Sequence, residues 1–128
     1  MWPVLSVFVG GGVGALLRWF LAIKFNPAEA EPAFPFGTLA ANLGGAFLIG
    51  LLLAAFALRT DWPEETRLLL NVGFLGGLTT FSTFSAEVVQ LLAHGRLGLG
   101  FITLASNLCG SLALAAFGLV LGRLIFKV

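Results

Sequence analysis

Four long apolar stretches constrain the fold of this 128-residue sequence more than any other feature. They cover residues 4–23, 37–58, 68–92 and 98–121. Each is long enough to cross a bilayer as a helix, which takes about 20 apolar residues. Only 10% of the residues are charged, whereas soluble domains carry about 25%. The sequence therefore predicts an all-α integral membrane protein with four transmembrane helices, which form a single domain over residues 1–128.

The remaining composition excludes several classes of function. A net charge of +1 provides no basic field that would capture nucleic acid, and a chain this apolar cannot form an ordinary soluble enzyme. Cys109 is the only cysteine and His94 the only histidine, so we expect neither a disulfide framework nor a thiolate or imidazole metal site. We therefore expect a non-enzymatic membrane protein with no nucleic-acid partner.

The basic residues leave the orientation in the membrane open. With four spans both termini lie on the same side of the membrane. That side carries four basic residues, and the opposite side carries two or three. So weak a bias permits insertion in both directions, which would allow two copies to pair head to tail. A polar pathway also has to be shielded from lipid, and four short helices enclose little volume, so we expect at least a dimer. The residues compared are Arg59, Arg67, Arg123 and Lys127 against Lys24, Arg96 and Arg18.

Small residues recur at spacings that let helices approach one another closely. Four glycines lie within residues 10–14, and Gly44 and Gly45 lie in the second stretch. Gly118 and Gly122 lie one helical turn apart in the fourth. We interpret these residues as packing contacts between helices.

The third stretch has a different composition at its centre. Residues 76–85 read GGLTTFSTFS, a glycine pair followed by five hydroxyl residues and two phenylalanines. Adjacent glycines weaken a helix by about 1 kcal/mol each, and Ser and Thr side chains compete for its backbone hydrogen bonds. The pattern predicts a break in the helix between Gly76 and Thr79, near the middle of the membrane. Broken transmembrane helices recur at ion and substrate sites, which favours a functional break over flexible packing.

Three polar residues of the other stretches share one layer of the membrane. Because successive spans run in opposite directions, Arg18, Asn42 and Glu87 all lie about 8 Å inside the same surface. Glu87 is the only acid within a span, and its depth matches that of Arg18. We therefore expect these two residues to form an ion pair.

A polar stripe continues from this layer toward the middle of the membrane. Thr103, Asn107 and Ser111 share one face of the fourth helix, opposite Phe81 and Phe84, which lie one turn apart. Such stripes either hold helices together or line a permeation route. Because this stripe reaches the depth of the break in the third stretch, we favour a route. Amide and hydroxyl donors, the positive edges of phenylalanine rings and the charge of an arginine suit a small anion.

Three segments together resemble the Fluc/CrcB family of fluoride channels. They read GGLTTFSTFSAE at residues 76–87, GGGVGALLRW at residues 10–19 and GTLAAN at residues 37–42. The resemblance covers all four spans and implies an antiparallel, dual-topology homodimer with two pores. It implies that fluoride leaves the cytoplasm passively through these pores, across the bacterial inner membrane.

The resemblance also implies roles for particular residues. Two backbone oxygens of each subunit, at Gly76 and Thr79, would hold a structural sodium ion at the centre of the dimer. The fourth position of the family's polar track is occupied here by Ala115, which has no hydroxyl. The pore-lining residues would be Phe81, Phe84, Asn42, Ser82, Thr83, Ser111, Asn107 and Thr103, with Arg18 and Glu87 in the vestibule.

Two other classes of membrane protein have four spans and a comparable length. A proton-coupled antiporter similar to the small multidrug-resistance transporters would need a glutamate in its first helix, and the first stretch here has none. A non-transporting assembly subunit would account for the glycines but not for the phenylalanine and hydroxyl string. The sequence therefore favours a channel.

Overall fold

The computed structural model describes residues 1–26, 28 and 32–127, and every regular element in this part of the chain is a helix. The third span, Glu64–Ala93, is composite, because it contains a short helix α3, a π-helical segment η1, a single turn α4 and a helix α5. Among the described residues, four helices are long and apolar enough to cross a membrane, which confirms the four predicted spans. The elements are α1 (Trp2–Phe25), α2 (Phe36–Leu58), α3 (Glu64–Arg67), η1 (Leu68–Leu75), α4 (Gly76–Leu78), α5 (Phe81–Ala93) and α6 (Leu97–Phe126).

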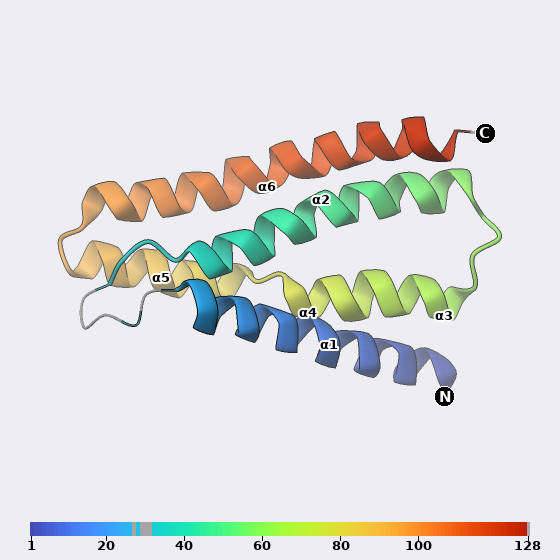
Figure 1. Ribbon diagram of the computed structural model, residues 1–128, viewed down its shortest axis with the longest axis horizontal. Helices are drawn as coiled ribbons and strands as arrows, with labels where there is room; N and C mark the ends of the chain where they lie inside the picture. The colour runs from blue at the N-terminus through green and yellow to red at the C-terminus, as the bar shows by residue number, and fades with distance from the viewer. Residues whose placement is uncertain (27, 29–31, 128) are drawn as a thin grey trace.

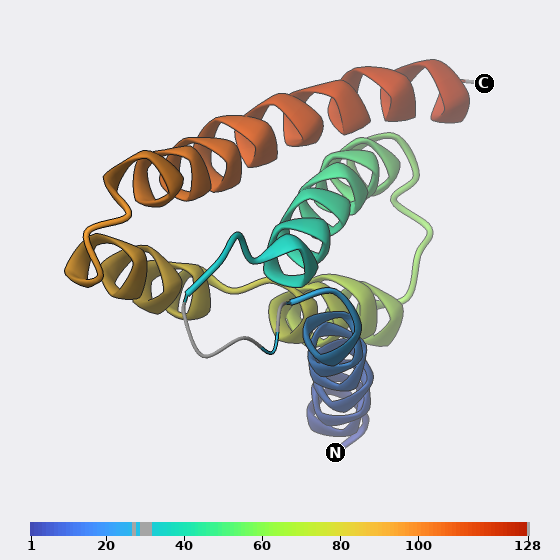
Figure 2. The same cartoon turned by 60° about the vertical axis from the view of Figure 1, so that its left-hand side comes forward.

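The chain crosses the length of the molecule four times and brings both termini to the same end (Figure 1). Two helix pairs form the main contacts: α1 packs on the first half of the third span, and α2 packs along α6. The second half of the third span, α5, turns away from α1 and packs on α6 (Figure 2). The break therefore separates the first half of the span, which packs against α1, from the second half, which packs against α6.

Local sequence signals fix several helix ends. Asn26, which follows α1, accepts hydrogen bonds at its Oδ1 from the backbone N–H of Gly37 (2.7 Å) and of Thr38 (3.3 Å). These bonds satisfy free donors in the first turn of α2. Gly95 has a φ of +74°, which only glycine adopts without strain, and it allows the tight turn from α5 to α6.

Several of the predicted glycine contacts are confirmed. A Cβ added at Gly14 would meet the Phe74 carbonyl oxygen, and one added at Gly118 would meet the Phe47 carbonyl oxygen, so these glycines let neighbouring backbones touch. Gly12 and Gly44 have no neighbour within 4 Å of an added Cβ. Those two glycines therefore make no packing contact within the described chain.

The predicted break in the third span is confirmed, and it lies at the end of the predicted segment. Thr79 (φ −85°, ψ 154°) and Thr80 (φ −153°, ψ 125°) are extended, whereas Gly76 (φ −62°, ψ −37°) is helical. The second glycine of the pair serves packing, because a Cβ at Gly77 would meet the Gly11 carbonyl oxygen of α1. The hydroxyl residues, rather than the glycine pair, form the non-helical backbone, as expected for side chains that compete for backbone hydrogen bonds.

Candidate functional site

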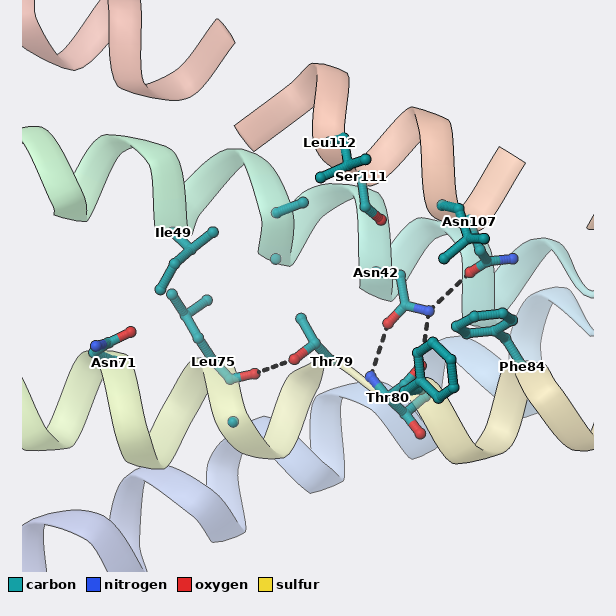
Figure 3. A pocket seen from close by; sticks show the side chains of 15 residues that line it. Asn42, Ile49, Asn71, Leu75, Thr79, Thr80, Phe84, Asn107, Ser111 and Leu112 are labelled. Atoms are coloured by element: carbon teal, nitrogen blue, oxygen red, sulfur yellow. Dashed lines mark hydrogen bonds between the residues drawn. The ribbon is translucent and has the colours of Figure 1, made fainter. Parts of the chain in front are cut away.

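A pocket of about 510 Å³ lies beside the break, between α2, the third span and α6 (Figure 3). It contains most of the residues that the sequence singled out, and it opens on one side of the chain. Its lining residues are Asn42, Gly45, Ala46, Ile49, Asn71, Leu75, Gly76, Thr79, Thr80, Phe81, Phe84, Asn107, Leu108, Ser111 and Leu112.

Asn42 on α2 replaces the helical hydrogen bonds that the break removes. Its Oδ1 accepts from the Thr80 backbone N–H at 2.8 Å, and its Nδ2 donates to the Thr80 carbonyl oxygen at 3.0 Å. The same Nδ2 donates to Asn107 Oδ1 at 2.8 Å. Asn42 is buried, and both of its N–H groups are taken up by protein acceptors. Its amide therefore holds α2, the break and α6 together.

The break removes the helical donors of four backbone carbonyls, those of residues 76–79, and two of these belong to the predicted ion ligands Gly76 and Thr79. The Thr80 N–H would pair with the Gly76 carbonyl oxygen in a continuous helix, but it donates to Asn42. The Thr83 N–H would likewise pair with the Thr79 carbonyl oxygen, but it donates to Thr80 Oγ1 at 3.1 Å. The oxygens of Gly76 and Thr79 are thus available as ligands.

Two neighbouring carbonyls, those of Leu75 and Gly77, have other donors. Leu75 O accepts from both the backbone N–H (3.0 Å) and the hydroxyl (2.8 Å) of Thr79. Gly77 O accepts from Arg18 Nε at 3.0 Å. The described residues contain no cluster of three His, Cys, Asp or Glu side chains suited to a metal. A cation held here would therefore depend on backbone oxygens, which are hard ligands suited to hard ions.

Phe81 and Phe84 form an edge-to-face pair in the pocket. Their ring centroids are 4.8 Å apart and their planes meet at 73°. Phe84 is only 4% exposed, whereas Phe81 is 70% exposed. The pair therefore leaves one ring for contact with a second molecule.

The polar stripe of α6 reaches the pocket only in part. Asn107 and Ser111 line it, but Thr103 is fully buried and donates its hydroxyl hydrogen to the Leu99 carbonyl oxygen at 2.8 Å. Asn107 Nδ2 donates to the Thr103 carbonyl oxygen at 2.9 Å. Ala115 lies at the contact with α2, where its carbonyl oxygen faces Gly50. Within the described chain the accessible stripe therefore ends at Ser111.

Ser82 and Thr83 lie in the first turn of α5, outside the pocket lining. Thr80 Oγ1 caps this turn, since it accepts from the Thr83 N–H and donates to Thr83 Oγ1 at 3.0 Å. Ser82 Oγ lies 3.5 Å from the same hydroxyl. The hydroxyl string thus stabilises the start of α5 within one chain.

The expected ion pair between Arg18 and Glu87 is absent from the described residues. Arg18 reaches the Gly77 carbonyl oxygen at the break, deeper than its backbone position indicated, because its long side chain can extend along the helix. Glu87 Oε1 accepts from the Thr38 hydroxyl at 2.6 Å, and that hydroxyl accepts from Asn26 Nδ2 at 3.2 Å. Glu87 Oε2 is buried without a hydrogen-bond partner among the described residues.

One polar residue of the pocket, Asn71 on η1, is not among the residues predicted from the sequence. It precedes Leu75 by four residues and Thr79 by eight, and all three line the pocket. This helical spacing from the break is the signal that indicated Asn107 and Ser111 on α6, and it would have indicated Asn71 as well.

In the described part of the chain, four apolar helices, a span broken near its centre and a mostly apolar pocket with a few polar groups at that break are typical of small membrane proteins that conduct or transport solutes. The profile of the CrcB-like protein family (camphor resistance, CrcB) matches residues 5–119. The chain belongs to this family.

Relatives from several bacteria bear the name fluoride-specific ion channel FluC. The protein of Bordetella avium is 53% identical over 121 residues, which is 94% of this chain and 93% of the relative. That of Burkholderia lata is 48% identical over 122 residues (95% and 94%), and that of an Escherichia coli strain is 52% identical over 113 residues (88% and 87%). With four membrane-spanning helices and these relatives, the chain is a multi-pass protein of the bacterial inner membrane and not an enzyme.

Proposed function

We propose that this chain is a fluoride-selective channel that lowers cytoplasmic fluoride by passive export. The observation that carries the proposal is the identity of 53% over 94% of the chain to a relative named as a fluoride-specific ion channel. The segment that forms the break and the phenylalanine pair also carries the family resemblance. Five residues of this segment line the pocket: Gly76, Thr79, Thr80, Phe81 and Phe84.

The functional unit is an antiparallel homodimer with two pores. The pocket opens on one side, and Phe81 and Gly76 are exposed there at the depth of the membrane. Polar backbone cannot face lipid, so this side requires a protein partner. A second copy inserted in the opposite direction brings the two breaks together at the midplane and closes one polar path on each side.

Fluoride moves along a path of weak contacts. The positive ring edges of Phe81 and Phe84 and the Ser111 hydroxyl face this path, with hydroxyl donors of Ser82 and Thr83 at the start of α5. Asn42 and Asn107 form its wall, and Thr103 supports Asn107 from behind. Several weak contacts replace part of the water around fluoride without a deep energy well, so the ion can leave again. Glu87 belongs to the vestibule, and Arg18 extends from the vestibule to the Gly77 carbonyl oxygen at the break.

A structural sodium ion joins the two subunits at the centre. The freed carbonyl oxygens of Gly76 and Thr79 fit such an ion, because they are uncharged hard ligands and two chains together supply four of them. Bound sodium would satisfy oxygens that hydrocarbon leaves without a partner. In each chain, Asn42 and Arg18 hold the backbone of the break so that these oxygens stay free.

The function is tested with purified protein in liposomes loaded with fluoride. A potassium ionophore supplies the counter-current, and a fluoride electrode records release. We expect fast fluoride release that is not coupled to protons, and no release of chloride. Proton-coupled exchange would instead support the antiporter, although α1 contains no acid. Absence of any flux from correctly assembled protein would refute the channel.

A further inference from the structure

The amide of Asn71 is a polar group of the pocket that has no role in the pore proposed above. Asn71 lines the pocket from η1, and the described chain offers its side chain no hydrogen-bond partner. Figure 3 shows it at one end of the pocket, with Asn42, Asn107 and Phe84 at the other. An amide in a hydrocarbon environment is costly unless it finds a partner. A second chain is the available source of that partner.

The symmetry of the proposed dimer fixes the depth at which Asn71 meets the second chain. Its two-fold axis lies in the membrane plane and relates the Gly76 and Thr79 oxygens of the two chains. Asn71 lies five residues before Gly76, and Phe84 lies five residues after Thr79. Because the axis reverses the chain direction, it brings Asn71 of one protomer to the depth of Phe84 of the partner subunit.

We propose that Asn71 of each protomer completes the pore of its partner, where its amide N–H groups face fluoride beside the ring edge of Phe84 of the partner subunit. This inference rests on the antiparallel channel proposed above. Amide N–H groups are good donors to a small anion, and the N–H groups of Asn42 are already taken up by protein oxygens. Asn71 therefore supplies free amide donors that the path lacks within one chain.

Cross-linking tests the placement. In a Cys109→Ser background, the double variant Asn71→Cys with Phe84→Cys is treated in membranes with a short thiol-specific bifunctional reagent. Within one chain the two positions are 13 residues apart, about 20 Å along the span, which is beyond the reach of such a reagent. We expect covalent dimers from the double variant and none from either single variant. Cross-linking by Asn71→Cys alone, or none by the double variant, would overturn the placement.

Flux measurements test the role. Asn71→Leu keeps the size of the side chain and removes its donors, and we expect fluoride efflux to fall about tenfold, the equivalent of one hydrogen bond of about 1.4 kcal/mol. Asn71→Ser retains a donor and should recover part of the rate. The control is Val72→Leu, at a neighbouring residue that is 52% exposed and does not line the pocket. It should conduct like the parent.

The outcomes separate this inference from the proposed function. Parental flux in Asn71→Leu would refute the role of Asn71 and leave the channel intact. A parent chain that moves no fluoride would refute the channel, while cross-linking would still report where Asn71 lies. If Asn71→Leu does not elute as a dimer in size-exclusion chromatography, its flux does not report on the pore. The cross-linking result then decides whether Asn71 lies beside Phe84 of the partner subunit.

Discussion

At the scale of single residues, the two phenylalanines differ in burial, and this difference decides which of them gives the cleaner test of the pore. Phe84 is 4% exposed and contributes to packing, whereas Phe81 is 70% exposed. A substitution of Phe84 therefore changes both the pore and the stability of the fold. A substitution of Phe81 changes mainly an exposed surface, which we propose faces fluoride and the second chain.

We predict that Phe81→Ile slows fluoride efflux by about tenfold or more, because the side chain stays large and apolar but loses the positive ring edge. The variant should remain a dimer with a thermal unfolding temperature near that of the parent. Efflux and unfolding are measured on the same preparation. An unaltered rate would show that the ring does not contact the ion.

Asn42 is a structural residue, since its amide makes three hydrogen bonds to the break and to α6. Asn42→Asp removes both donors and places a carboxylate against the oxygens of Thr80 and Asn107. We predict a loss of stability of about 2–5 kcal/mol together with a loss of flux. Thermal unfolding in detergent measures the first effect.

The matched control for Asn42→Asp is Ser111→Ala, which also removes a donor from the pocket lining. Ser111 makes no hydrogen bond between its side chain and another helix in the described chain, so its replacement should reduce flux and leave the unfolding temperature near that of the parent. If Asn42→Asp were as stable as the parent, the amide would not hold the break.

At the scale of elements, the contact of α1 with the third span depends on glycine at particular positions. A Cβ at Gly14 would meet the Phe74 carbonyl oxygen, whereas one at Gly12 would meet nothing within 4 Å. The glycines of α1 are thus not equivalent, although they follow one another closely in the sequence. The one that faces the third span sets how near α1 lies to the break, where Arg18 binds the Gly77 carbonyl oxygen.

We predict that Gly14→Val destabilises the fold by about 1–3 kcal/mol, because helix backbones have to separate to accommodate the side chain. Gly12→Val should change stability by less than about 0.5 kcal/mol within the chain. Thermal unfolding of the two variants provides the comparison. Equal effects would indicate that intrinsic helix propensity, and not the contact with η1, determines the outcome.

At the scale of the whole molecule, the break depends on groups from three other helices. Arg18 on α1 binds Gly77, Asn42 on α2 binds Thr80, and Asn107 on α6 binds Asn42. The oxygens of Gly76 and Thr79 are left for the proposed ion between the two subunits of the proposed dimer. The conducting structure is therefore expected to exist only in the assembled dimer.

We predict that removal of sodium lowers the stability of the dimer and stops fluoride flux, and that restoring sodium reverses both effects. Thr79→Ser should retain the response, because the ligand is a backbone oxygen. Calcium or magnesium should not replace sodium, since these ions favour anionic or more numerous oxygen ligands. A protein equally stable and active in sodium-free medium would contradict the site.

The sequence by itself determined the four spans, the break and the family, because these depend on properties of neighbouring residues. Apolar length defines a span, and hydroxyl side chains next to a glycine pair compete locally for the backbone hydrogen bonds of a helix. Local periodicity also predicted that Asn107 and Ser111 share one face of α6, and both residues line the pocket.

Only the tertiary structure decided which groups satisfy the break. Asn42 and Thr80 are 38 residues apart, and Arg18 and Gly77 are 59 apart, so no local pattern specifies these pairs. The same holds for Thr103, whose burial depends on its neighbours, and for Glu87, whose partner is Thr38 rather than Arg18. In a medium without water, each polar group bonds to whichever group the packing of the helices brings within reach, and that packing is a property of the whole fold.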